Sequence, residues 1–375
     1  MTIPLFTVFM PKDVDSPLLN TLHSGYIGQG AQVKEFESKL GERFCNENAL
    51  TLNSATSGLQ LALRLANVGP GDEVISTPMT CTASNMPILA AGAKIVWADI
   101  SPQTGLIDPL DIERKINGKT KAILCVDWGG MPCDYDAIMD IANRYRYGIK
   151  VIQDSAHAIG SQYRGRIVGT IADYTVFSFQ AIKHISTVDG GVLFCKSSSD
   201  YHRGKLLRWY GIDREGERRD FRCEEDILEW GYKFHMNDIN ATIGIAALSH
   251  LDSIVGQHRS HALYYSDVIN PSYYILPDER DMPYQAESSY WLYTIQLPNE
   301  KSRVSFMQFM KDNDVMVSQV HARNDTHSAF APFRCNLPGV NQFVDRQVSI
   351  PVHWNLGDPE LKKIADLCNR FAERK

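Results

Sequence analysis

Two side chains near the middle of the sequence follow apolar stretches, where they could take part in acid–base or carbonyl chemistry. Asp154 follows residues 149–153, and Lys183 follows the aromatic-rich residues 174–179. A lysine in apolar surroundings has a lowered pKa and can form an imine with a carbonyl compound. A carboxylate at a strand end can pair with a cationic nitrogen of a ligand, or it can simply cap the next helix. Neither residue by itself therefore identifies the chemistry of a site.

Two further segments could approach a ligand through their backbone. Residues 53–58 (Asn-Ser-Ala-Thr-Ser-Gly) would direct free N–H groups and a helix dipole at an anion, although an ordinary Ser/Thr N-cap has the same composition. Gly190 and Gly191 suggest a tight turn close to a ligand or to neighbouring backbone. An anion site near residue 55, an acid at 154 and a lysine 29 residues later follow the order expected of a pyridoxal-phosphate (PLP) enzyme.

The elements that must position these residues alternate between helical and strand periodicity from about residue 31 to 250. This alternation predicts an α/β fold whose sheet is covered on both faces. Helices are expected where Val33, Phe36, Leu40 and Phe44 recur, and again over residues 59–65. Six or seven strands should form one large sheet, and ligands of such sheets bind at the carboxyl ends of the strands. The strand candidates are residues 49–52, 74–77, 94–98, 122–126, 149–153, 174–179 and 192–195.

The pattern changes after about residue 250. A helix bearing Leu248, Leu251 and Ile254 is expected to lead into a proline-containing stretch. Beyond it we expect strands at 291–297 and 315–320 and helices at 304–311 and 360–371. The sequence therefore predicts a large α/β domain over residues 1–250 and a smaller α+β domain over residues 251–375, each of ordinary domain size.

The composition argues against several classes of function. The chain has 375 residues and a formal net charge of −6, which argues against a nucleic-acid-binding protein. Residues 215–222 carry three arginines but also three acids, so we expect a solvated loop there. The eight cysteines form no C-x-x-C pair, and His258 and His261 lack a third ligand nearby, so no metal site is predicted. No signal peptide or membrane span is evident, and we expect a cytoplasmic protein.

The motifs resemble the DegT/DnrJ/EryC1/StrS family of PLP-dependent sugar aminotransferases, which have fold type I, the aspartate aminotransferase-like fold. The resemblance runs through nearly the whole chain and implies a large, mostly parallel sheet domain with a smaller C-terminal α+β domain. The segments that carry it are residues 24–30, 53–58, 70–75, 77–85, 154–158, 177–179 with Lys183, and 231–239.

The resemblance also implies residue roles. Lys183 would be catalytic, holding PLP as the internal aldimine and then shuttling a proton, and Asp154 would keep the pyridine nitrogen protonated. The other residues implied to contact the cofactor are Ser54, Ala55, Thr56, Cys81, His157, Ser178 and Lys233. The substrate contacts implied are Tyr26, His184, Arg323 and His327. The family pattern further implies a homodimer with shared active sites, in which Lys233 and the loop near Tyr26 reach the neighbouring subunit.

Three positions depart from the usual family pattern. Cys81 stands where an aromatic residue usually stacks on the pyridine ring, and a thiol is a weaker stacking surface. Lys233 replaces a common asparagine, and His235 replaces a frequent arginine. The face of the ring at Cys81 must therefore be covered by something smaller or by another residue.

The reaction implied by the resemblance is amino transfer from glutamate or glutamine to a keto group of a nucleotide-linked deoxysugar. Relatives that carry histidine in place of the lysine are dehydratases; here Lys183 occupies the position and His184 follows it. Three alternatives stay open: a nucleotide-sugar dehydratase or another fold type I enzyme, a catalytically idle regulatory relative, and a dinucleotide-binding enzyme. The last is weak because Gly28-Gln29-Gly30 lacks both a preceding strand and a third glycine.

Overall fold

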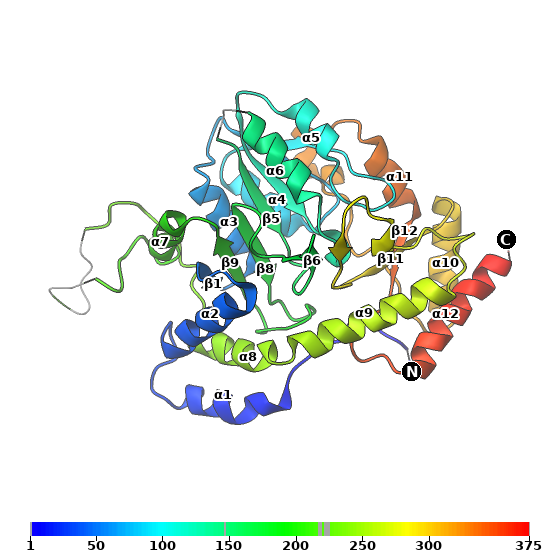
Figure 1. Cartoon of the computed structure of the whole chain (residues 1–375), viewed down its shortest axis with the longest axis horizontal. Helices are drawn as coiled ribbons and strands as arrows, with labels where there is room; N and C mark the ends of the chain where they lie inside the picture. Colours follow the sequence, from blue (N-terminus) through cyan, green and yellow to red (C-terminus); the bar gives the residue numbers. More distant parts are fainter. Residues whose placement is uncertain (1, 146–147, 217–219, 221–225, 375) are drawn as a thin grey trace.

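A seven-stranded sheet forms the centre of the molecule (Figure 1). The computed structural model describes residues 2–145, 148–216, 220 and 226–374. Within the sheet the strand order is β1-β9-β8-β5-β4-β2-β3, and β9 alone runs antiparallel to its neighbours. The strands are β1 (Ala49–Leu52), β2 (Glu73–Ser76), β3 (Lys94–Trp97), β4 (Thr120–Val126), β5 (Lys150–Asp154), β8 (Tyr174–Ser178) and β9 (Gly191–Cys195). All seven predicted strands are confirmed, as is the mostly parallel α/β fold.

The strands lie between two layers of helices, which explains their continuous apolar runs. On one face, Phe177 of β8 and Phe194 of β9 pack against Phe44 of α2, with ring centroids 5.1 and 5.4 Å from the Phe44 ring. Val176 points to the other face, where α3 passes so closely that a Cβ on Gly58 would lie 3.0 Å from the Val176 methyl carbon. The helices of this part are α1 (Asp15–Leu22), α2 (Ala31–Phe44), α3 (Ala55–Leu65), α4 (Thr82–Ala90), α5 (Pro109–Lys115), α6 (Tyr135–Arg144), α7 (Ser198–Leu207) and α8 (Asp238–Leu248).

The helix expected around Leu248, Leu251 and Ile254 is in fact two helices. The chain bends by 57° between α8 and α9 (Leu251–Val268), with Ser249 and His250 at the break. α9 then leads from the sheet to the C-terminal elements (Figure 1). Among the described residues no single helix is long and apolar enough to cross a membrane, and the bent pair passes that test only through its combined length and composition.

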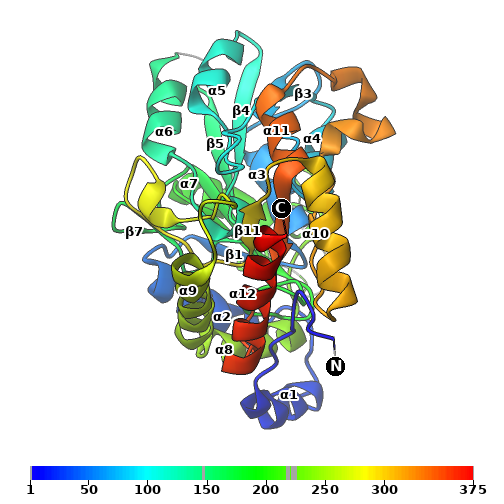
Figure 2. The same ribbon diagram turned by 90° about the vertical axis from the view of Figure 1, so that its right-hand side faces the viewer.

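The C-terminal elements enclose a separate apolar core (Figure 2). The strand predicted at 291–297 and the helices predicted at 304–311 and 360–371 are confirmed as β11, α10 and α12. The strand that pairs with β11, at residues 347–350, was not predicted, and the strand expected at 315–320 is wrong. That segment makes only isolated bridges, from Val315 to Ile3 and from Ser318 to Ser349. The elements are β11 (Tyr293–Gln296), β12 (Gln347–Ile350), α10 (Glu300–Asp312), α11 (Pro338–Arg346) and α12 (Asp358–Glu373), and a small sheet joins β6 (Gln162–Tyr163), β7 (Arg166–Ile167) and β10 (Ala286–Glu287).

The amino terminus belongs structurally to this C-terminal core. Ile3 is buried there, its N–H donates to the carbonyl of Asp314, and its own carbonyl accepts from Met316, both at 2.9 Å. The domain limits at 250 and 251 therefore stay a prediction, with the first residues of the chain packed against the predicted second domain.

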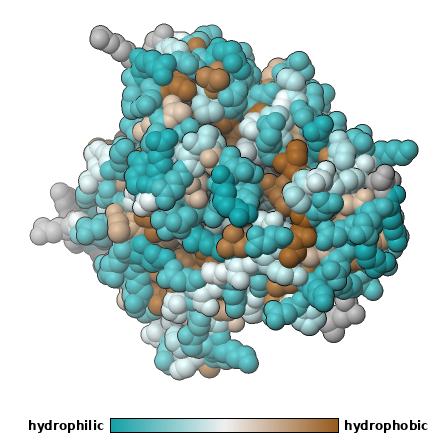
Figure 3. Space-filling view, turned by 45° about the vertical axis from the view of Figure 1, so that its right-hand side comes forward, coloured by the Kyte–Doolittle hydropathy of each residue, from teal (hydrophilic) through white to brown (hydrophobic). Residues whose placement is uncertain are grey.

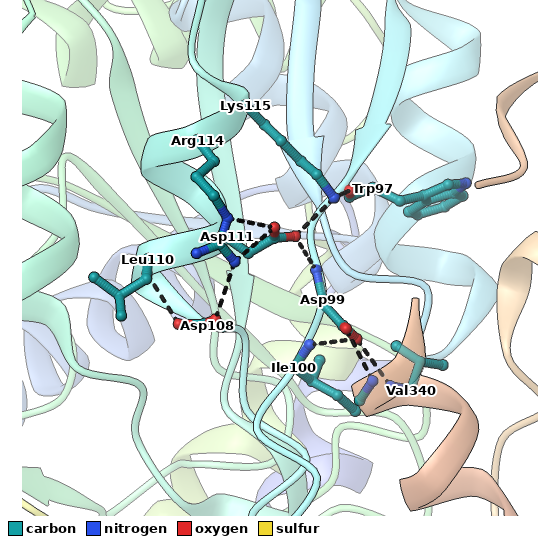
Figure 4. Close-up of polar contacts among 10 residues, drawn as sticks. Trp97, Asp99, Ile100, Asp108, Leu110, Asp111, Arg114, Lys115 and Val340 are labelled. Carbon is teal, nitrogen blue, oxygen red and sulfur yellow. Dashed lines mark hydrogen bonds and ion pairs between the residues drawn. The ribbon is translucent and has the colours of Figure 1, made fainter. Parts of the chain in front are cut away.

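Asp99 fixes α11 to the edge of the large sheet (Figure 4). Its carboxylate accepts hydrogen bonds of 2.9 Å from the N–H groups of Gly339 and Val340 in the first turn of α11. A carboxylate is favourable there because the first N–H groups of a helix lack intrahelical acceptors. Asp111, which is ion-paired with Lys115 at 2.7 Å, accepts in turn from the backbone N–H of Asp99. The C-terminal elements are thereby held against the edge of the sheet.

The face shown in Figure 3 is mainly hydrophilic and carries a band of apolar residues. The arginine-containing run at 215–222 lies partly outside the described residues, so its predicted solvated loop is not described. Among the described residues no group of three or more His, Cys, Asp and Glu side chains could hold a metal ion.

Candidate active site

A cavity of about 500 Å³ lies where the carboxyl ends of β5 and β8 meet the amino terminus of α3. Its size is typical of a small-molecule site. Asp154 is the last residue of β5, Ser178 is the last of β8, and Ser54 caps α3. Of the nine residues expected to contact the cofactor, all but Lys233 line this cavity: Ser54, Ala55, Thr56, Cys81, Asp154, His157, Ser178 and Lys183.

Lys183 lies in a tight turn after β8, where its N–H donates to the carbonyl of Gln180 at 2.9 Å. Its Nζ lies 3.6 Å from the ring centroid of Trp291. Desolvation lowers the pKa of Lys183 to about 7, although the nearby charge of Asp154 opposes the change. A substantial fraction of this amine is therefore unprotonated at neutral pH, the form that attacks a carbonyl carbon.

Asp154 is buried and held in one orientation. Its Oδ2 accepts from the Ser84 hydroxyl at 2.6 Å, and its Oδ1 accepts from the Ala156 N–H at 3.1 Å. Burial raises the pKa of Asp154, while these two bonds and the charge of Lys183 oppose the rise. The carboxylate is thus fixed in the cavity wall and suited to pair with a protonated nitrogen.

The amino terminus of α3 offers backbone donors to the cavity. Ser54 Oγ accepts from the N–H of Ser57 at 3.1 Å, which leaves the N–H groups of Ala55 and Thr56 without an intrahelical acceptor. Gly191 allows this close approach, since a Cβ there would lie 2.6 Å from the backbone nitrogen of Ala55. Free N–H groups, the helix dipole and nearby hydroxyls together form a site for a phosphate group.

His157 is buried in a stack of rings beside the cavity. Its ring lies 3.9 Å from the Trp291 ring and nearly parallel to it, and Phe6 stacks on Trp291 at 5.0 Å. Burial lowers the pKa of His157 well below its usual value, so the ring is neutral. The N–H of Gly129 points to Nδ1 at 3.4 Å, which places the ring proton on Nε2.

Residues that sequence reasoning did not assign also line the cavity, among them Phe6, Ser84, Trp291 and His321. Trp291 donates from Nε1 to the carbonyl of Ile182 at 2.9 Å, next to Lys183. These residues are distant from the lysine in the sequence, and no local pattern distinguishes them. Only the fold brings them to the site.

The remaining expected site residues lie outside the lining of this cavity. Tyr26 is 51% exposed and donates to the carbonyl of Gln29, and Lys233 is also exposed. His184 is buried with its Nε2 3.0 Å from the carbonyl oxygen of Ser289. Arg323 binds the Asp325 carboxylate through two hydrogen bonds of 2.7 and 2.6 Å, and His327 is exposed.

Comparison with known proteins identifies relatives of the whole chain. The family model described as the DegT/DnrJ/EryC1/StrS aminotransferase family matches residues 11–368. The crystal structure of AtS13 from Actinomadura melliaura is 38% identical, covers 98% of both chains and superposes with a TM-score of 0.92. The sugar aminotransferase CalS13 from Micromonospora echinospora is 34% identical over 98% of this chain and 99% of its own, also with a TM-score of 0.92.

A further relative is named for polysaccharide biosynthesis. The spore coat polysaccharide biosynthesis protein SpsC of Bacillus subtilis is 28% identical over 97% of this chain and 95% of its own. Solved structures similar to this chain also include one described as a PLP form. The resemblance inferred from the motifs is thereby confirmed at the level of family, fold and cofactor.

Proposed function

Because the chain belongs to the DegT/DnrJ/EryC1/StrS aminotransferase family, whose members are PLP-dependent, we propose that it aminates a keto group of a nucleotide-linked deoxysugar, with glutamate or glutamine as donor. The observation that carries the proposal is the single cavity in which Lys183, Asp154 and the amino terminus of α3 meet. The three groups match a cofactor with an aldehyde, a ring nitrogen and a phosphate.

The residues present fit PLP. A Cβ at Gly191 would collide with the backbone of Ala55, so this glycine keeps the phosphate site open. Ala55, Thr56 and Ser178 would donate to phosphate oxygens, and Asp154 would hold a proton on the pyridine nitrogen. When bound, PLP supplies an electron-withdrawing ring that stabilises negative charge at the carbon attached to the substrate nitrogen.

Lys183 would bind the cofactor aldehyde covalently. With its amine free, Nζ of Lys183 would move a proton from one carbon to another, because a group with a pKa of about 7 is both a competent base and a competent acid. Nζ of Lys183 lies 3.6 Å from the centroid of the Trp291 ring, a position that favours its protonated form. The chain's own part in the reaction is thus proton transfer at Nζ together with exclusion of water by the surrounding rings.

The placement of Lys183 and His184 favours amino transfer over dehydration. Lys183 reaches the cavity, whereas His184 is buried outside it and is directed to the carbonyl of Ser289. The lysine rather than the histidine is therefore the group that faces the cofactor. The intact Lys183 and Asp154 also speak against a catalytically idle relative.

We also propose that the protein is a homodimer. Tyr26 and Ile27 are 51% and 53% exposed, and Lys233 is exposed as well, although the family resemblance assigns the loop near Tyr26 and Lys233 to an active site. Exposed apolar side chains next to such residues suit a subunit interface in which each chain completes its neighbour's site. Full activity in a monomer isolated by size-exclusion chromatography would contradict a homodimer with shared active sites.

The proposal is tested in two half-reactions on purified protein. Glutamate or glutamine should convert the bound PLP to its pyridoxamine form, with loss of the visible absorbance, and a nucleotide-linked keto sugar should restore it. Lys183→Ala should abolish both changes, whereas Lys311→Ala, which removes an exposed amine of α10, should abolish neither. Wild-type protein whose spectrum responds to no donor would refute the aminotransferase assignment.

A further inference from the structure

Trp291 contacts both the amine of Lys183 and the peptide bond before it, although the two residues lie far apart in the sequence. Nζ of Lys183 lies 3.6 Å from the centroid of the indole ring. The indole Nε1 donates to the carbonyl of Ile182 at 2.9 Å, and this carbonyl belongs to the peptide bond that leads into Lys183. One side chain therefore contacts the amine of the lysine and holds its backbone.

The residue after Lys183 is bonded to the same stretch of chain. Nε2 of His184 donates to the carbonyl of Ser289, two residues before Trp291, at 3.0 Å. Burial lowers the pKa of His184 to about 4, so its ring is neutral and carries its proton on Nε2, toward that carbonyl. The turn that carries Lys183 is thus joined on both sides to residues 289–291.

The backbone that presents Trp291 is strained. Tyr290 has a φ of +47°, a region that bulky residues rarely adopt. Its carbonyl accepts from Nδ1 of His258 at 2.9 Å, and its N–H donates to Oγ of Ser288 at 3.0 Å. Strain of this kind persists only where surrounding contacts impose it, and it is concentrated at functional sites.

Two further rings fix the indole in the wall of the cavity. The His157 ring lies 3.9 Å from it with an interplanar angle of 23°, and the Phe6 ring lies 5.0 Å from it with an angle of 20°. Only 2% of Trp291 is exposed. An indole packed in this way keeps its place relative to Nζ of Lys183.

The indole ring and the apolar surroundings have opposite effects on the charge of Lys183. The face of an aromatic ring attracts an ammonium group, and the attraction is stronger where water is excluded. Desolvation, by contrast, favours the neutral amine and lowers the pKa of Lys183 to about 7. The indole therefore limits how far burial can lower this pKa.

Other titratable groups also surround Nζ. The three histidines among them are neutral because burial lowers their pKa, whereas Asp154 favours the ammonium form and Cys81 adds to this effect. These groups stay unchanged when residue 291 is substituted, so they serve as a constant background. The full set is Asp154, Cys81, His157, His184, Asp189 and His321.

Building on the proposed function of Lys183, we propose that Trp291 is a positioning residue whose ring face holds the ammonium form of Nζ inside the apolar cavity. A group that carries a proton from one atom to another must be able to keep it between the two steps. The indole would give Lys183 this ability where water cannot.

The pKa of Lys183 is measured on cofactor-free protein by trace acetylation with acetic anhydride between about pH 5 and pH 10. Only the unprotonated amine reacts, so the pH dependence of the rate, followed by mass spectrometry of the peptide that contains Lys183, gives the pKa. Lys311, an exposed lysine of α10, is the internal reference in the same sample.

Three substitutions separate the ring face from the hydrogen bond. Trp291→Phe, Trp291→Leu and Trp291→Met all remove the Nε1 donor, but only phenylalanine keeps an aromatic face. The pKa of Lys183 should be lower with leucine or methionine than with phenylalanine by about half a unit to one unit, the shift expected from a lost cation–π contact. Water admitted by a smaller side chain would raise the pKa, so it cannot produce this result.

An equal or higher pKa in the variants without a ring would overturn the inference. Two such variants are made so that the comparison survives if one of them fails to fold, which thermal unfolding will show. Trp354→Leu is the matched control: this indole also donates to a backbone carbonyl, that of Thr7 at 3.1 Å, but lies outside the cavity lining. It should leave the pKa of Lys183 at the wild-type value.

A separate measurement tests the proposed function on which the inference rests. Borohydride reduction of wild-type protein loaded with PLP should attach the cofactor to Lys183, as identified by the mass of the modified peptide. Attachment elsewhere, or none, would refute the assigned role of Lys183. The comparison of Trp291 variants is made without cofactor, so its failure would overturn the role of Trp291 alone.

Discussion

Gly191→Ala tests whether the close approach of α3 to β9 creates the phosphate site. The added methyl carbon would lie 2.6 and 2.8 Å from the Ala55 nitrogen and Cα, and 2.9 Å from the carbonyl oxygen of Phe177. All three atoms belong to the backbone, so no flexible side chain can move aside. Ordinary contact begins at about 3.4 Å, and α3 must therefore shift by roughly half an ångström or more.

This shift has two measurable consequences. Overpacking of this kind costs about 1–3 kcal/mol of folding free energy, which lowers Tm by several degrees. Displacement of the Ala55 and Thr56 N–H groups weakens charge-assisted bonds to the phosphate, so the dissociation constant for PLP should rise about tenfold or more. Titration of cofactor-free protein with PLP, followed by visible absorbance, measures the second effect.

Gly256→Ala is the matched control. Gly256 lies within α9, and a Cβ there would meet no atom within 4 Å. Alanine favours a helix over glycine by about 1 kcal/mol, so this variant should be slightly more stable and bind PLP like wild type. If Gly191→Ala kept both wild-type stability and wild-type PLP affinity, the described packing of α3 on β9 would be refuted.

Three further predictions concern single residues near the cavity. Val188 has a φ of +71° and is 57% exposed, so Val188→Gly should relieve strain with little loss of burial and raise stability by about 0.5–1 kcal/mol, measured by thermal unfolding; a lower Tm would contradict this. Since burial lowers the pKa of Lys183 to about 7, the rate of PLP binding should rise from pH 6 to 8 and then level off, and a rate that climbs steadily to pH 10 would contradict a lowered pKa. Cys81 lines the cavity and is partly exposed, so iodoacetamide should label it in cofactor-free protein and PLP should protect it; labelling unaffected by PLP would place the cofactor away from Cys81.

The central sheet could be predicted because its strands are buried on both faces. Such strands are continuous apolar runs that end at polar or glycine-containing turns, and this contrast is visible in the sequence. The break between α8 and α9 could not be predicted in this way. Leu248, Leu251 and Ile254 keep helical spacing across it, so the local pattern gives no sign of the bend.

The segment at 315–320 shows where a local pattern misleads. Its alternating valines favour a strand, but the chain turns sharply at Val320, and Ser318 and Gln319 hydrogen-bond to their surroundings instead of extending a ladder. The structure uses these residues to present His321. Sequence reasoning fails here because tertiary contacts impose a conformation that the local preferences oppose.

The residues of the candidate site fall into two groups: those that the sequence identifies and those that only the fold brings together. Lys183 and Asp154 could be identified because Asp154 ends one buried strand and Lys183 lies shortly after another, and parallel strands carry their ends to one edge of the sheet. Trp291 and His321 enter the cavity from the C-terminal part of the chain, more than a hundred residues after Lys183 in the sequence. Nothing local marks them, because their role arises only when the C-terminal elements pack against the large sheet.

The most direct test of the account is transfer of a labelled nitrogen. Wild-type protein loaded with PLP is incubated with ¹⁵N-labelled glutamate and a panel of nucleotide-linked keto sugars, and the sugar nucleotides are analysed by mass spectrometry. The account predicts a ¹⁵N-labelled amino sugar that forms with wild-type protein and is absent with Lys183→Ala. PLP-loaded protein that converts its cofactor with glutamate but delivers no label to any sugar nucleotide would contradict it.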